Sequence, residues 1–342
     1  DARLLSAISF ERHLYRSGQL EGRSVPGFGT LDINNADGAL DHWRGLAFDG
    51  RRVRLLLGGD RFRLADYRTV FDGTAERIEF DDDRIRLHLR DLQVLFERPL
   101  QQTLYLGTGE SEGDAGLKGR PKPLCYGRCF HVPAVLVDAA TLTYQVHDGQ
   151  ISGIDAVFDS GLALTAGTEP PAPSHYAVDL SAGTFRLGSA PNGPVTAHVH
   201  GDATGGAYAE DAASLMLRIA MRASGLTLID WGAFAGLTLA APMATGFFVG
   251  QETGMLSALD SLADSIGAHF GFDRQGQSTV GRLTEPAETA TESFDDSAIV
   301  SLEREPSALP LWRQKLGYAR YWRPLSDGES ASALGAEARS DL

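Results

Sequence analysis

The chain has 342 residues, 43% of them apolar and 22% charged, and a formal net charge of −14. This is globular composition for about two to three domains, and the acidic balance disfavours general nucleic-acid binding, which needs a basic face. No apolar run reaches the about 20 residues of a membrane helix, so no membrane span is expected.

Residues 1–98 predict a small antiparallel β-barrel or sandwich, because short strand-like runs alternate with turn signals. One run carries Ile85, Leu87 and Leu89 on one face and charged residues on the other, which is typical of a half-buried strand. A break is expected at Asp72-Gly73, and one helical turn at residues 92–96. The expected strands are residues 4–10, 28–34, 53–57, 74–80 and 84–89.

Residues 99–200 predict a second β domain. Its longest glycine-rich stretch, residues 107–121, has no Gly-Lys-Ser/Thr sequence and precedes strands, so we expect a contact loop and no phosphate site. The expected strands are residues 124–137, 142–146, 151–158, 161–165, 176–180, 184–187 and 195–200.

Residues 201–325 predict an α+β domain with two helices, near residues 212–223 and 256–266, each followed by a glycine. A hairpin is expected from 270–272 to 279–283, closing strands are expected at 299–302 and 314–322, and residues 326–342 are expected to be a polar tail or linker. The predicted fold class is mainly β with an α+β part, in which several small antiparallel barrel or sandwich domains accompany a two-helix domain.

Two groups of residues are candidates for binding a metal. His198 and His200 share one face of an expected strand, as metal ligands in β-barrels do, but no pattern supplies a third ligand. The favoured interpretation is two polar residues at the exposed end of a strand, and the alternative is a metal-dependent enzyme that uses both histidines.

The second group is Cys125, Cys129 and His131. Zinc sites with this spacing have a second ligand pair, which the chain lacks, so buried packing of the two cysteines is favoured over a shared site at a symmetry axis. No hydrolase sequence pattern is present. We therefore expect no bound metal, no cofactor, no catalytic residue and no enzymatic activity.

The last aromatic and arginine-rich segment is a candidate interface, since Trp, Tyr and Arg are enriched at binding hot spots. A core strand with a charged outer face is an equally good interpretation. The candidate residues are Trp312, Arg313, Arg320, Tyr321 and Trp322.

Three stretches in this order carry a family resemblance. The first is FGTLDINNADGALD at residues 28–41, followed by FDGR at 48–51. The second is KGRPKPLCYG at 118–127 with YQVHDG at 144–149, and the third is VTA at 195–197 with Gly201, a helix and GAHFGFD at 267–273. Together they resemble baseplate hub, or tail-tip, proteins of siphophages, prophages and gene transfer agents, over roughly residues 5–323.

The resemblance implies a structural virion protein without catalytic residues. It implies a homotrimer that caps the tail tube, contacts the distal tail protein and the tape measure protein, and carries tail fibre or spike proteins. DNA is then expected to pass its channel without specific binding, in keeping with the acidic charge. The implied location is the tail tip of a virion assembled in the host cytoplasm. Such proteins are often longer, so further domains are expected beyond Pro324.

The alternative function is that of a carbohydrate-binding or glycan-degrading component of the tail that binds a receptor. This function requires an exposed aromatic platform, or two carboxylates that face each other across a cleft.

Overall fold

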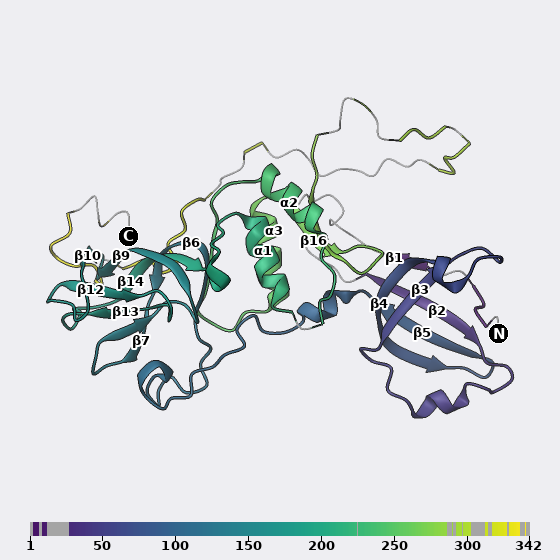
Figure 1. The fold of residues 1–342 in the computed structure, drawn as a ribbon, viewed down its shortest axis with the longest axis horizontal. Helices are drawn as coiled ribbons and strands as arrows, with labels where there is room; N and C mark the ends of the chain where they lie inside the picture. The colour runs from purple at the N-terminus through teal and green to yellow at the C-terminus, as the bar shows by residue number, and fades with distance from the viewer. Residues whose placement is uncertain are drawn as a thin grey trace. The chain divides into compact units, whose positions relative to one another are not determined.

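The protein is mostly β, with 35% strand and 17% helix, in a computed structural model with four sheets and three helices. The predicted mainly-β class with an α+β part is therefore confirmed (Figure 1). None of the helices in the part of the chain described has the length and apolar character that a membrane crossing requires. The structure describes residues 3–6, 9–11, 27–223, 225–285, 289, 292–295, 297–301, 312–313, 317–326, 328–335 and 339.

The chain forms two compact units. Unit 1 comprises Asp1–Arg98, Ala220–Leu237 and Leu259–Trp312, and unit 2 comprises Pro99–Ile219, Thr238–Ala258 and Arg313–Leu342. The first change of unit coincides with the expected boundary after residue 98. Residues 201–325, expected as one α+β domain, contribute to both units.

Unit 1 contains a curled half-barrel whose antiparallel strands lie in the order β1-β2-β5-β4-β3. The alternation along β5 is as predicted, because Ile85, Leu87 and Leu89 are buried together in the core of this sheet. The strands are β1 (Ser9–Glu11), β2 (Phe28–Asn34), β3 (Arg52–Leu57), β4 (Arg68–Phe80) and β5 (Arg84–Arg90).

The break expected at Asp72-Gly73 is wrong, because β4 runs through it. A Cβ atom on Gly73 would collide with the Arg90 carbonyl oxygen and the Phe71 ring, so this glycine permits close packing inside a strand rather than a turn. The helical turn expected at residues 92–96 is confirmed as η3, and its Phe96 packs on Phe270 and Phe272. The 3-10 helices are η1 (Asp41–Gly45), η2 (Leu64–Asp66), η3 (Leu92–Phe96), η4 (Glu110–Glu112) and η5 (Thr204–Gly206).

Unit 2 contains two five-stranded sheets, in the orders β10-β9-β14-β6-β15 and β11-β12-β13-β8-β7. Buried side chains from both sheets form one core, as in a sandwich. The strands are β6 (Leu124–Pro133), β7 (Val135–Asp138), β8 (Thr143–Gln145), β9 (Ile151–Asp159), β10 (Leu162–Ala163), β11 (Thr165–Ala166), β12 (His175–Asp179), β13 (Thr184–Leu187), β14 (Val195–Asp202) and β15 (Gly246–Val249).

Two of the three helices, α1 (Ala212–Met221) and α3 (Met255–Ser265), lie where the sequence predicts helices. The helix α2 (Trp231–Ala240) was not predicted, because its residues WGAFAGLTLA are apolar on every side and show no helical period. The hairpin of β16 (Ala268–Phe272) and β17 (Ser278–Arg282) is confirmed. The closing strands are wrong where they are described: residues 299–301 and 317–320 form no strand, and Tyr321 makes one isolated bridge to Phe130.

The pairing of β6 with β15 depends on Gly127, which lies opposite Gly246 with a φ of 63°. A Cβ atom there would meet the Thr245 carbonyl oxygen. We expect Gly127→Ala to lower the free energy of unfolding by about 2 kcal/mol or more, because it adds a steric clash to a left-handed backbone. Gly153→Ala in β9, where a Cβ meets nothing within 4 Å, is the control in a urea titration. Equal effects of the two substitutions would contradict this account.

Candidate functional site

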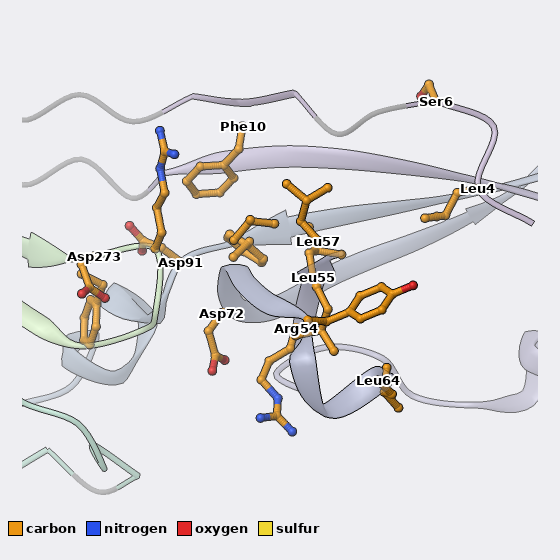
Figure 2. A pocket seen from close by; sticks show the side chains of 16 residues that line it. Leu4, Ser6, Phe10, Arg54, Leu55, Leu57, Leu64, Asp72, Asp91 and Asp273 are labelled. Atoms are coloured by element: carbon orange, nitrogen blue, oxygen red, sulfur yellow. The ribbon is translucent and has the colours of Figure 1, made fainter. Parts of the chain in front are cut away.

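The half-barrel of unit 1 is open between its two edge strands, β1 and β3. A pocket of about 960 Å³ lies at this opening, which we call the seam (Figure 2). The rings of Phe10 and Phe71 pack against each other at one side of it, with centroids 4.7 Å apart and planes tilted by 54°. The apolar side chains that line it come from Leu4, Phe10, Leu55, Leu56, Leu57, Leu64, Val70, Phe71 and Phe272.

Three carboxylates also line the seam, and each one supports the local fold. Asp72 is buried and accepts hydrogen bonds from Arg52 at 2.8 and 2.9 Å. Asp91 accepts hydrogen bonds from the backbone N–H groups of residues 27 and 93, both at 3.0 Å. Asp273 accepts from the backbone N–H groups of residues 275 and 277 in the hairpin turn. These contacts stabilise the local fold. The three carboxylates are not arranged as the facing acid and base of a glycosidase.

The segment from residue 51 to residue 70, which we call the edge surface, is basic in an acidic chain. Its sequence contains six arginines and two aspartates. Among the described residues, Arg61, Arg63 and Arg68 are exposed and form no ion pair, and the same holds for Arg54. Four other arginines of unit 1 form ion pairs, at 2.7 to 3.1 Å: Arg3–Asp37, Arg77–Glu79, Arg86–Asp32 and Arg90–Asp49.

Large apolar side chains lie exposed between these arginines. Leu57 is 67% exposed, Phe62 60% and Leu64 74%. The strand β3 pairs only with β4 in the described sheet, so its outer edge leaves backbone hydrogen-bonding groups without a strand partner. Exposed apolar and arginine side chains beside a free strand edge are typical of an interaction surface.

The two histidines proposed as metal ligands lie within β14 rather than at an exposed strand end, so the expected position is wrong. The ring of His198 packs against those of Phe130 and His131, with centroids 5.2 and 4.5 Å away. His200 Nε2 lies 2.8 Å from Asp155 Oδ2. The two rings therefore serve different neighbours, and within the described residues no group of three possible ligands could hold a metal ion.

The cysteines are buried and free, and both belong to the core of unit 2, as the packing interpretation predicts. Cys125 Sγ lies 3.2 Å from the Val146 carbonyl oxygen. Burial raises the pKa of the Cys125 thiol, which keeps it protonated. His131 does not join the two cysteines, because its Nδ1 lies 3.1 Å from Thr196 Oγ1 among aromatic rings.

The candidate interface at the end of the chain divides into two parts. Trp312 is 92% exposed, and Arg313 and Arg320 are exposed too. Trp322 packs on Phe248 and on the core of unit 2, as the core interpretation predicts.

Residues 321–323, which we call the strap, lie along β6. The backbone N–H of Trp322 donates to the Phe130 carbonyl oxygen at 3.1 Å, and that of Arg323 donates to the His131 carbonyl oxygen at 3.0 Å. The Tyr321 ring lies 4.4 Å from the His131 ring. Beyond the strap, Ala331 donates to the Ser160 carbonyl oxygen. This part of the expected polar tail therefore docks on unit 2.

The sequence interpretation missed the edge surface, although the run of six arginines was visible as a signal. The comparisons with known proteins add no further assignment. No protein-family model matches the chain, and no curated protein matches it either.

Proposed function

We propose that the chain is a structural virion protein, the baseplate hub at the tail tip of a long-tailed phage. As a homotrimer it closes the tail tube, holds the distal tail protein and the tape measure protein, and anchors fibre or spike proteins. It performs no catalysis. The family resemblance suggests this role, and the observation that carries it is the open half-barrel with its seam and edge surface.

The physical argument concerns the unpaired edge of β3. A strand edge with exposed leucines and arginines is an aggregation hazard unless another chain covers it. A head-to-tail contact of this kind closes into a ring when its rotation divides a full turn. A ring of three chains covers the β3 edge of each chain and leaves a central channel, through which DNA passes.

The alternative, a glycan-binding or glycan-degrading component, has less support. The three carboxylates at the seam are engaged with Arg52 and with backbone N–H groups. A metal-dependent enzyme also has less support, because His198 and His200 face different neighbours.

The test is the mass and symmetry of the purified protein. Native mass spectrometry is expected to give three chains, and electron microscopy a threefold ring with a central channel. A monomer with a deep acidic cleft would contradict the proposal. A stoichiometric metal ion that is lost in His198→Ala or His200→Ala would support the enzyme instead.

A further inference from the structure

A second segment of unit 1 has the opposite character to the edge surface. Residues 283–301 contain no lysine, arginine or histidine. We call their described part, residues 283–285, 289, 292–295 and 297–301, the acidic arm. It has neither helix nor strand, and Glu285, Glu292 and Asp295 are exposed on it.

The acidic arm also exposes large apolar side chains. Phe294 is 69% exposed, Ile299 45% and Val300 100%. Among the described residues, neither Glu292 nor Asp295 forms an ion pair. Asp295 accepts hydrogen bonds from Ser297, which lower the pKa of its carboxyl group and keep it charged. The arm therefore presents negative charge and apolar surface that form no ion pair with any part of the chain that the structure describes.

The two surfaces match in both charge and polarity. The edge surface carries unpaired arginines beside Leu57, Phe62 and Leu64, and the acidic arm carries unpaired carboxylates beside apolar side chains. Opposite charges around an apolar centre give an interface its register and its choice of partner. Since the described residues of the two surfaces form no ion pair with each other, a second copy is the occupant that supplies the match.

We propose that the acidic arm of one copy docks on the edge surface of the next copy. Phe294 and Val300 enter the apolar seam beside Leu57 and Leu64, and Glu292 and Asp295 pair with Arg61 and Arg63. This inference rests on the proposed function, in that it requires the chain to assemble with itself. The contact joins two different surfaces, so it builds a ring of three chains when it relates neighbours by a third of a turn.

A charge exchange tests this contact. The edge variant carries Arg61→Glu and Arg63→Glu, and the arm variant carries Glu292→Arg and Asp295→Arg. Each variant alone is expected to stay monomeric where the wild-type chain is assembled, because like charges then face each other. The fourfold variant, with both exchanges in one chain, is expected to assemble again with the wild-type number of chains.

Mixing the two variants gives a sharper result. In an equal mixture, an arm-to-edge contact between unlike variants is complementary, whereas a contact between like variants is repulsive. Three chains cannot form a closed ring in which every neighbour is the other variant. Native mass spectrometry is therefore expected to show pairs that contain one chain of each variant. The control, Arg44→Glu with Arg77→Glu, makes the same change of charge at two exposed arginines of unit 1 and is expected to assemble as wild type.

The outcomes separate the two proposals. If the edge and arm variants both assemble as wild type, the docking is wrong and the proposed function stands. If the fourfold variant is folded by circular dichroism and stays monomeric, the docking is wrong as well. If the wild-type chain is monomeric at every concentration, the proposed function falls, and the docking falls with it.

Discussion

Replacing Asp202 by alanine is expected to lower the free energy of unfolding of unit 2 by about 3–5 kcal/mol. Asp202 is buried at the end of β14, and its Oδ2 accepts a hydrogen bond from Arg218 Nη1 at 2.7 Å. Burial acts to raise the pKa of Asp202, but hydrogen bonds from Thr204 and Arg218 outweigh it and hold the pKa below its usual value. The substitution leaves the largely buried guanidinium of α1 without its carboxylate.

Two further variants calibrate this effect in chemical denaturation. Asp202→Leu with Arg218→Met removes both charges and is expected to cost less than Asp202→Ala alone, because no buried charge is left unpaired. Glu329→Ala breaks the half-exposed pair with Arg323 and is expected to cost much less than Asp202→Ala, because solvent screens this pair. If Asp202→Ala costs no more than Glu329→Ala, the buried pair does not anchor α1.

Lowering the pH from 7 to 4 is expected to destabilise unit 2 by about 3 kcal/mol through His131 alone. Burial, and then the charge of His198, lower the pKa of His131 from 6.5 to about 4. The folded state therefore favours the neutral imidazole more than the unfolded state does. The resulting stability is fully present above pH 6.5, and it is lost as the pH falls through 6.5 towards 4.

The His131→Gln variant isolates this contribution, because carboxylates also titrate in the same range. Its loss of stability between pH 7 and 4 is expected to be smaller than that of the wild type. A nuclear magnetic resonance titration of the folded protein is expected to place the pKa of His131 near 4. Because residues 321–323 lie on His131, the protection factors of their amides are expected to fall in acid. An identical pH dependence in the two proteins would show that His131 has no such role.

The sequence predicted those parts of the fold in which local pattern and tertiary environment agree. The strand β2 has the expected bounds, and β5 buries its expected face, because one side of each strand meets the core. The helices α1 and α3 were found because each has one apolar side. The helix α2 was missed, since it is apolar all round.

The predictions that were wrong concern residues whose structure depends on tertiary contacts, which a local sequence pattern does not show. Gly73 sits inside β4 because Phe71 and Arg90 need its missing side chain. His198 is packed among rings that come from separate strands. Val300 lies in an apolar run that suggests a strand, yet it is fully exposed. No local pattern shows which arginines of unit 1 have a carboxylate partner, because Asp32, the partner of Arg86, lies far away in the sequence.

The order in which the ribosome makes the chain has a consequence for how the two units form. Each unit is assembled from three separate stretches, and the last stretch of unit 1 ends at Trp312, after which the last stretch of unit 2 begins. Contiguous domains fold one after the other as they emerge. Here the core of the half-barrel comes from the first stretch of unit 1, which leaves the ribosome early, whereas unit 1 as a whole is complete only after residues 259–312. A stop codon within that stretch leaves both units incomplete, so each unit is completed only at a late stage of translation.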